Sequence, residues 1–384
     1  MKNGQGETME EEKATNTCCA KEYSRKKVWL TFIGFGLTCL ILAVMVATGF
    51  AGALRTYVSG FVASPWLVVG GFFLFFSLCV YILEFPLHWY GAFALEHQYH
   101  LSNQTFLQWL WEDSKKQWLS FGVGIVLVEL LYLCIRCYPQ TWWVYVWGIW
   151  ILFSVVFGKL FPVFIVPLFY KYSTVPDTAL RDRLRAFVDA FGMRVKDVYS
   201  IDLSKTTKKA NACFCGLGKT KRVILADTLL NAFTPDEIES VLAHEIGHYR
   251  KKHIVKNIVV SCVVSLVTFY VLYYLLQRLV PVLHYTAESD VATLPLLMLL
   301  ASIMGFFMMP LQNMLSRRME NEADDFAIDT TKNKNAFFSA MDRLADMNLA
   351  DRTPHPAIEF LLYSHPSISK RIARQRARCA KEAS

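Results

Sequence analysis

The sequence predicts an all-α polytopic membrane protein of about six transmembrane helices, with a smaller α+β domain inserted between the fourth helix and the fifth. Three observations support this class. Hydrophobic residues make up 54% of the 384 residues and charged residues only 19%, whereas soluble domains are about one quarter charged. The apolar residues gather in blocks of about 20, which is the length that crosses a bilayer. Between two groups of such blocks, the composition returns to that of a soluble domain.

Six apolar blocks are long enough to span a membrane. Four precede the soluble stretch and two follow it, at about 28–50, 62–83, 119–135, from Trp142 onward, 255–277 and 294–312. The first block is not a signal peptide, because it is longer than the apolar core of one and follows a polar arm of 27 residues.

Positive charge predicts the orientation. Lys and Arg gather before the first and third spans, between the fourth and fifth, and after the sixth, while the other loops hold few. By the positive-inside rule, both termini and the soluble stretch then face the cytoplasm. The membrane would be the endoplasmic reticulum in a eukaryote and the cytoplasmic membrane in a bacterium. The net charge of +8 fits these flanking positions, so no nucleic-acid partner is expected.

These patterns divide the chain into five parts. We expect a polar cytoplasmic arm (1–27), a four-span membrane region (28–169), a cytoplasmic domain (170–254), a two-span hairpin (255–312), and the C-terminal part of the same cytoplasmic domain (313–384).

The cytoplasmic domain begins with helical and strand-like patterns. Apolar residues recur at helical spacing in 177–191. Two β-like runs follow at 196–202 and 221–227, with NACFCG (211–216) between them and a hairpin connection at 216–221. The next helix begins at Thr234, because a threonine, a proline and a glutamate three residues on form an N-terminal capping signal.

That helix carries the sequence HEIGH. His244 and His248 are four residues apart and therefore lie on one helical face, where two imidazoles can bind one zinc ion. Glu245 flanks the metal and can take a proton from a bound water. A catalytic zinc needs a third protein ligand and leaves its fourth position to water.

The third ligand is not expected within the same helix. His253 follows at a tempting distance, but the extended metzincin motif needs glycine at 251 and histidine at 254. The chain has Lys251 and Ile254 at these positions. The metzincin class is therefore excluded.

A better candidate lies after the sixth span, where 316–327 is predicted as a helix. Glu320 and Asp324 share one face of that helix, four residues apart. Glu320 is expected to be the third ligand, and Asp324 to bond the other nitrogen of a ligating histidine and fix its tautomer. Glu322 lies about 160° around the helix from Asp324 and is not expected to bind. The alternative is that both motifs are solvated helix faces with a packed histidine pair.

The chain resembles the type I CAAX prenyl endopeptidases, which are integral-membrane proteases that bear HExxH and cleave prenylated C-terminal motifs. About 300 residues take part in the resemblance. The segments that carry it are LEFPLHWYGAFALEHQYHLSNQT (83–105), NACFCG (211–216) with KTKRVILADTLL (219–230), HEIGHYRKKH (244–253), SRRMENEADDFA (316–327) and YSHPSISKRI (363–372).

The resemblance implies a zincin-type metalloprotease domain with one catalytic zinc ion. His244, His248 and Glu320 match the family's zinc ligands. Glu245 matches its general base, and Asp324 its supporting acid. Both assignments agree with the spacing argument.

The resemblance also implies further residues at the reaction centre. Asn211 and Ala212, followed by Cys213, match the strand that pairs with an extended peptide substrate by β-augmentation. His365 and Arg371 match a histidine and an arginine that lie by the reaction centre, where either can stabilise the oxyanion. The alternatives are that His365 caps the turn at the following proline and that Arg371 is a surface charge.

The family's architecture implies helices that ring a large water-filled chamber. Eukaryotic members have about seven spans, so the six expected here lack one at the N-terminus. The long acidic insertion that some animal members carry before HExxH is also absent. The expected partners are membrane lipid and a prenylated or membrane-anchored peptide, and the protein is expected to be a monomer.

Two other functions fit parts of the pattern. A bacterial heat-shock type of metalloprotease, which degrades unfolded membrane proteins, shares HExxH and ExxxD but usually has fewer spans before the motif. A channel or transporter with a structural zinc site would fill all four positions with protein ligands, and no fourth ligand is evident. The sequence therefore favours peptide hydrolysis by metal-activated water.

Overall fold

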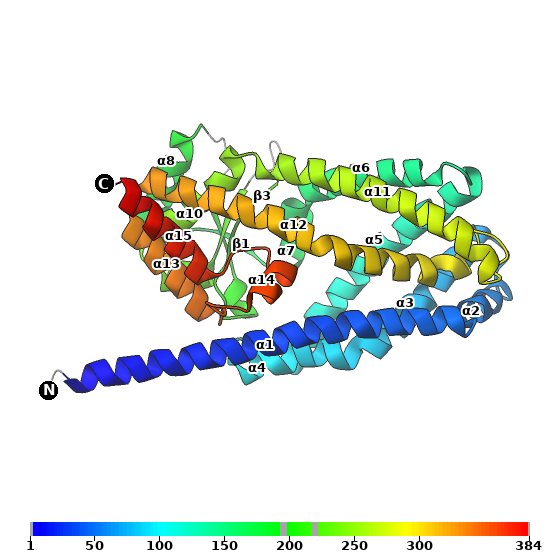
Figure 1. The fold of residues 1–384 in the computed structure, drawn as a ribbon, viewed down its shortest axis with the longest axis horizontal. Helices are drawn as coiled ribbons and strands as arrows, with labels where there is room; N and C mark the ends of the chain where they lie inside the picture. The colour runs from blue at the N-terminus through cyan, green and yellow to red at the C-terminus, as the bar shows by residue number, and fades with distance from the viewer. Residues whose placement is uncertain (1–2, 193–197, 217–221, 383–384) are drawn as a thin grey trace.

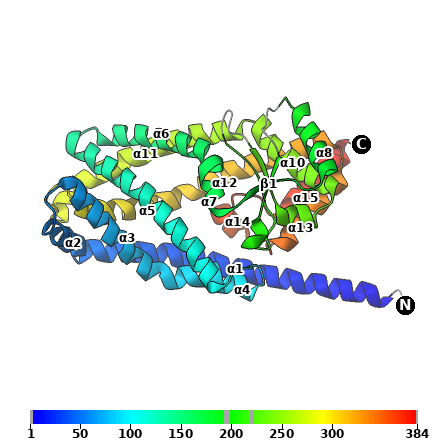
Figure 2. The ribbon, with the colours of Figure 1, turned by 180° about the vertical axis from the view of Figure 1, so that it is seen from behind.

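The computed structural model describes residues 3–192, 198–216 and 222–382. Long helices run side by side along most of the molecule, and the small sheet lies with its helices at one end (Figures 1 and 2). The membrane and C-terminal helices are α1 (Asn3–Ala47), α2 (Phe50–Ser59), α3 (Pro65–Trp89), α4 (Leu95–Gln98), α5 (Phe106–Cys137), α6 (Trp142–Leu160), α7 (Val166–Phe169), α11 (His253–Val282), α12 (Leu294–Thr331), α13 (Lys334–Met347), α14 (Pro356–Leu362) and α15 (Ile368–Glu382). Single π-helical turns at Tyr90–Ala94 and Phe161–Ile165 join α3 to α4 and α6 to α7.

Within the described residues, six helical stretches are long and apolar enough to cross a membrane. They are Thr17–Ala47, Pro65–Gln98, Phe106–Cys137, Trp142–Phe169, His253–Val282 and Val291–Thr331. Each predicted span lies mainly within one of them, although 28–50 extends beyond Ala47 and 62–83 begins before Pro65. The prediction of a six-span membrane protein is confirmed.

The polar arm expected at 1–27 is not a separate segment, because α1 runs as one helix from Asn3 through the first span. Lys26 pairs with Glu22 one turn earlier at 2.9 Å, and such i,i+4 pairs favour helix. Tyr23 is buried beside Leu95 and Leu101. These contacts extend the helix beyond its apolar block.

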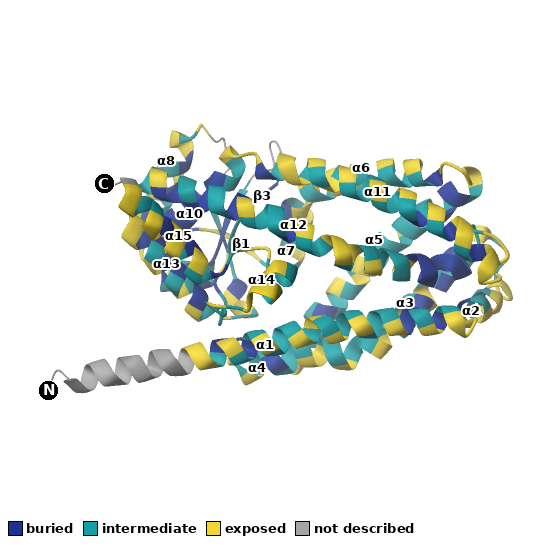
Figure 3. Ribbon diagram, in the orientation of Figure 1, coloured by how far each residue is buried: buried dark blue, intermediate teal, exposed yellow. Residues whose placement is uncertain are grey.

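The membrane helices meet at the end of the molecule remote from the sheet. Leu42, Phe72, Tyr132 and Leu276 are fully or almost fully buried there in one apolar cluster. Figure 3 shows this group of buried residues near α2, and a second group around the small sheet. Most residues between the two groups are only partly buried. The chamber expected from the resemblance stays a prediction.

The domain predicted as cytoplasmic, here called the sheet domain, contains a four-stranded sheet in the order β1-β2-β4-β3. The strands are β1 (Tyr172–Thr174), β2 (Val198–Ile201), β3 (Ala212–Cys215) and β4 (Arg222–Ala226). β2 and β4 are parallel, and both outer pairings are antiparallel. The two predicted strands are therefore present, and β3 and β4 pair as a hairpin would. The predicted connection at 216–221 lies outside the described residues except for Gly216. β3 is an edge strand.

The helices of this domain are α8 (Thr178–Ala190), α9 (Asp227–Ala232) and α10 (Pro235–Arg250). α10 begins as predicted: the Thr234 side chain accepts from the Glu237 N–H at 3.4 Å, and the Glu237 carboxylate accepts from the Thr234 N–H at 2.8 Å. Both backbone N–H groups of this capping box therefore have a hydrogen-bond acceptor. Glu237 is also almost fully buried, which fixes the start of the helix that carries the histidines.

α12 continues without a break from the last span into the sheet domain. The sequence predicted two segments, 294–312 and 316–327, but Pro310 lies inside one helix that ends at Thr331. α12 packs against α10 where Gly247 faces Ala323. A Cβ at Gly247 would lie 3.0 Å from the backbone of Ala323, so a side chain there would require the two helices to shift. The sixth span and the HExxH helix are therefore closely packed.

Candidate metal centre and active site

Three predicted ligands converge between α10 and α12. One donor atom from each of His244, His248 and Glu320 lies within 4.8 Å of the others, the only such group of three metal-binding side chains among the described residues. Nε2 of each histidine is 3.3 Å from a Glu320 carboxylate oxygen. His244 and Glu320 are buried, while His248 is half-buried. The third ligand thus comes from the helix that the sequence predicted.

These donors fit a divalent metal ion. Two imidazoles and one carboxylate are the donor set of several catalytic zinc sites. Oε2 of Glu320 is buried, lies 3.3 Å from Nε2 of His244 and makes no hydrogen bond within the described part of the chain. A buried charged oxygen without a hydrogen bond is costly. A cation held between these side chains would satisfy that oxygen.

Asp324 orients His244 from behind. Its carboxylate lies 2.9 Å from Nδ1 of His244 and accepts two N–H groups of Arg371 at 2.8 and 2.5 Å. Because an ionised carboxylate only accepts, Nδ1 of His244 carries the proton and Nε2 is free to bind a metal. Asp324 is fully buried and Arg371 is 6% exposed. The alternative that Arg371 is a surface charge is therefore wrong.

His248 is oriented by a second chain of contacts, which the sequence reasoning missed. Its Nδ1 lies 2.8 Å from Nδ1 of His253, and Nε2 of His253 lies 3.0 Å from the Glu322 carboxylate. The carboxylate requires a proton on Nε2 of His253, so Nδ1 of His253 accepts from His248. Nε2 of His248 is then free for a metal. Lys256 holds Glu322 at 2.9 Å. His253 and Glu322 lie outside the group of three converging donors, and they hold one of its members.

His365 reaches the same centre from the loop between α14 and α15. Its Nε2 lies 3.3 Å from Oε1 of Glu320, and its side chain is 59% exposed. Arg317 of α12 holds this loop, donating to the Tyr363 carbonyl at 2.7 Å. The other ring nitrogen, Nδ1, contacts the Ser364 hydroxyl at 2.9 Å, so His365 has only its Nε2 edge at the predicted metal ligands.

Glu245 lies between the metal ligands and the edge strand. Its carboxylate accepts the Phe214 N–H at 3.2 Å, and burial raises the pKa of this carboxyl above its usual value. A raised pKa lies closer to neutral pH, where the pKa of an effective general base lies. Sequence reasoning did not identify Phe214, because the strand register was not known.

The register decides which backbone groups of β3 are exposed at its free edge. The Ala226 N–H donates to the Asn211 carbonyl at 3.0 Å. Along an antiparallel pair, residues that exchange hydrogen bonds with the partner strand alternate with residues that do not. Asn211 and Cys213 therefore direct their backbone groups toward β4. Ala212 and Phe214 direct theirs toward the free edge, as the Phe214 contact with Glu245 requires. Of the predicted substrate strand, Ala212 is therefore the residue whose backbone faces the site.

A cavity of about 370 Å³ adjoins this edge. The predicted residues Asn211, Ala212, Glu245, His365 and Arg371 all contribute to its wall. Leu229, Val241, Met341 and Leu344 give it an apolar side in the sheet domain. The structure thus brings the predicted site residues to one region, and of these His248, Asp324 and Cys213 are absent from the cavity wall.

The family model of peptidase family M48 matches residues 175–379. The chain belongs to this family. The model of the CAAX prenyl protease N-terminal region, described as five membrane helices, matches residues 8–171 of this M48 member. Of the six candidate spans among the described residues, four lie in that range, one fewer than the description.

Similar proteins carry related names. Over 94% of its length the chain is 31% identical to an uncharacterized metalloprotease of Bacillus subtilis, YhfN, and it covers 85% of that protein. Over 81% of its length it is 27% identical to the CAAX prenyl protease 1 homolog of Taenia solium, covering 73% of it. The crystal structure of S. mikatae Ste24p matches with a TM-score of 0.84 at 23% identity, over 94% of this chain and 88% of the other. The fold is shared with that structure.

The M48 member described here is therefore a multi-pass membrane metallopeptidase. This confirms the predicted family, fold class and enzyme class. The main prediction is favoured over a quality-control protease and over a channel with a structural zinc site.

The contact between Gly247 and Ala323 predicts the effect of one added methyl group. We expect Gly247→Ala to push α10 from α12, lowering the free energy of unfolding by about 1–3 kcal/mol and weakening metal binding. Gly305→Ala is the matched control on α12, because a Cβ there meets no atom within 4 Å. The measurements are the thermal unfolding midpoint in detergent and metal affinity by competition with a chelating dye. Equal behaviour of the two variants would contradict the packing argument.

Proposed function

We propose that this protein is a zinc metalloendopeptidase that removes the C-terminal tripeptide from prenylated CAAX proteins at the cytoplasmic face of its membrane. The observation that carries the proposal is the convergence of His244, His248 and Glu320 beside Glu245 and the free edge of β3. It is supported by the M48 match and by the CAAX prenyl protease names of similar proteins.

The metal site would supply a Lewis acid that polarises the scissile carbonyl and lowers the pKa of water. His244, His248 and Glu320 would hold the ion, and Asp324 and His253 would keep the histidine tautomers that leave each Nε2 free. Glu245 takes the proton of the attacking water and passes it to the leaving amine.

The substrate peptide is expected to add to β3 as a further strand. Ala212 and Phe214 would provide the backbone groups for this pairing, and the Phe214 N–H would exchange its bond with Glu245 for one with the peptide. Antiparallel addition is expected, since it is slightly more stable per residue than parallel addition. His365 reaches toward the same position with its Nε2 and is the side chain proposed to donate to the oxyanion.

Arg371 is proposed as a positioning residue rather than an oxyanion donor. Its guanidinium makes two hydrogen bonds to Asp324 and lies 3.8 Å from Glu320. A buried charge in this position offsets the carboxylates around the metal. It acts on the substrate through Asp324 and His244.

The general base is tested by Glu245→Gln. We expect hydrolysis of a farnesylated CAAX peptide to fall at least about 10³-fold, because the amide cannot take the proton, while zinc content stays at that of the wild type. Glu239→Gln, on the same helix and paired with Arg183, is the matched control and is expected to keep activity. Peptide cleavage is measured by mass spectrometry. Substantial activity in purified Glu245→Gln protein would disprove the mechanism.

The substrate class is tested with a farnesylated peptide and its unmodified twin. We expect kcat/KM to be at least about tenfold higher for the farnesylated peptide, because an isoprenoid buried in an apolar environment contributes binding energy. Initial rates with wild-type protein in the same detergent provide the comparison, with a chelator as the blank. Equal rates would favour a quality-control protease instead.

A further inference from the structure

An apolar cavity of about 390 Å³ lies between α6 and α11, close to the metal centre. Its walls come from Trp150 and Val155 on α6, from Ile254 and Ile258 on α11, and from Gly216. The Ser154 hydroxyl, also in the wall, donates to the carbonyl of Trp150 in its own helix at 2.7 Å. The surface left for a ligand is therefore mainly hydrocarbon.

The position of Gly216 connects this cavity to the substrate strand. Gly216 follows β3 directly and has a φ of 90°, which favours glycine and ends the strand there. Phe214, whose N–H meets Glu245, is two residues earlier, so the mouth of the cavity is about 7 Å along the strand from that contact. A peptide paired with β3 would pass from the metal centre to this cavity.

The strand direction assigns the two ends of such a peptide. If the peptide is antiparallel to β3, its N-terminal side lies toward Gly216 and its C-terminal side toward Asn211. At the Asn211 end lies the cavity of the sheet domain, and at the Gly216 end lies the cavity between two membrane helices. In a CAAX peptide, the prenylated cysteine is on the N-terminal side of the bond to be cut and the tripeptide is on the C-terminal side.

We propose that the cavity between α6 and α11 binds the isoprenoid chain of the substrate cysteine. The proposal rests on the function proposed above, and it adds the binding site for the lipid part of the substrate. The volume lies in the range of about 300–1,000 Å³ that suits small organic ligands. Trp150 and Val155 belong to a candidate membrane span and are exposed, so the cavity is open to an incoming isoprenoid chain.

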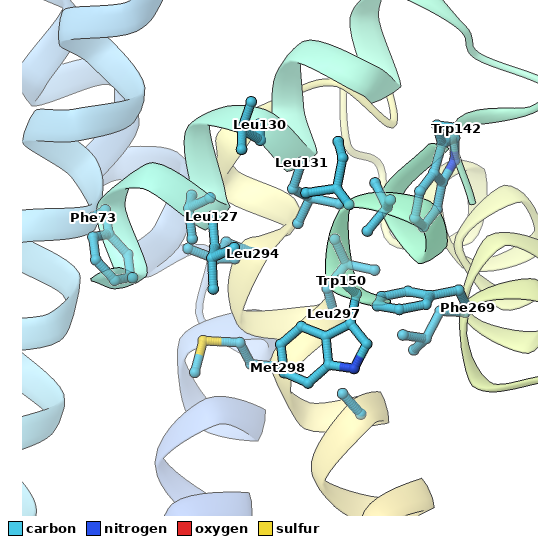
Figure 4. A pocket seen from close by; sticks show the side chains of 16 residues that line it. Phe73, Leu127, Leu130, Leu131, Trp142, Trp150, Phe269, Leu294, Leu297 and Met298 are labelled. Atoms are coloured by element: carbon cyan, nitrogen blue, oxygen red, sulfur yellow. The ribbon is translucent and has the colours of Figure 1, made fainter. Parts of the chain in front are cut away.

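Distance excludes the far side of the other apolar cavity of the membrane region. That cavity, of about 360 Å³, is lined by residues such as Phe73, Leu127, Leu294 and Met298, and it shares Trp150 with the proposed cavity (Figure 4). Met298 and Glu320 are both on α12, about 33 Å apart along its axis. A farnesyl chain has a main chain of twelve carbons, which is about as long as four extended residues, and therefore reaches about 14 Å. It cannot reach the Met298 side of the cavity of Figure 4 from the metal centre.

The proposed cavity is within that reach. Ile258 lies about 8 Å along α11 from His253, and the His253 ring is in contact with the metal ligand His248 at 2.8 Å. Both routes, along β3 and along α11, therefore bring the cavity within the length of one isoprenoid chain.

Filling the cavity provides the test. Gly158 of α6 lines it, and a Cβ at this position meets no atom within 4 Å. Gly158→Leu is expected to lower the ratio of kcat/KM for a farnesylated peptide to that for its unmodified twin by at least about tenfold. If the leucine keeps two CH₂ groups of the isoprenoid out of the cavity, the lost binding energy alone lowers kcat/KM by about this factor. Gly148→Leu is the matched control: it is on the same helix, its Cβ is also unobstructed, and it lies outside the cavity.

The outcomes separate this proposal from the proposed function. An unchanged ratio in Gly158→Leu, or an equal fall in Gly148→Leu, overturns the isoprenoid site while the wild type still prefers the farnesylated peptide. Cleavage of neither peptide by the wild type would instead refute the proposed function.

A second measurement does not depend on a cavity-filling variant. A farnesylated peptide with a benzophenone at the end of its isoprenoid is photolysed with the Glu245→Gln protein, and the labelled segments are identified by mass spectrometry. Labelling within 151–158 or 254–262 supports the proposal. Labelling within 294–301, or none above that of a detergent-solubilised benzophenone lipid, overturns it.

Discussion

The close packing of α10 against α12 is the constraint on which the site depends. Two of the proposed metal ligands lie on one helix and the third on the other. Gly247 permits the approach, because a Cβ there would lie 3.0 Å from the backbone of Ala323. Since α12 is also the last candidate membrane span, the membrane region and the sheet domain share one helix.

The metal ligands are held from two sides by charged groups that are themselves paired. On one side Asp324, fully buried, binds both His244 and Arg371. Burying such charges is expensive, and removing one partner of a buried pair typically costs about 3–5 kcal/mol. On the other side Glu322 acts through His253 at a half-exposed edge. The arrangement fixes both imidazole tautomers before any metal binds.

The local features of the structure could be predicted from the sequence. The spans follow from the length of the apolar blocks, the start of α10 from the Thr234 capping box, and the shared face of His244 and His248 from helical spacing. Each depends on residues close together in the chain. The i,i+4 relation between Glu320 and Asp324 was equally local, and it led to the correct helix.

The remaining features depend on contacts between distant segments. The partnership of His253 with Glu322 joins α11 to α12, and no periodicity within either helix contains it. The alignment of Ala212 with the free edge required the register of β3 on β4. The burial of Arg371 required the position of α15 against α12. The sequence did contain a signal for the contact of His253 with Glu322, because a third histidine follows HEIGH. Only the fold gives that histidine a role.

The central claim is that one zinc ion joins α10 to α12 through Glu320. It is tested most directly by the zinc content of the purified protein, measured by inductively coupled plasma mass spectrometry after dialysis against a mild chelator. We expect one zinc per chain in the wild type and in Asp329→Ala, a surface carboxylate of α12 paired with Arg378, and little zinc in Glu320→Ala. Full zinc content in Glu320→Ala, or no zinc in the wild type, would contradict the account.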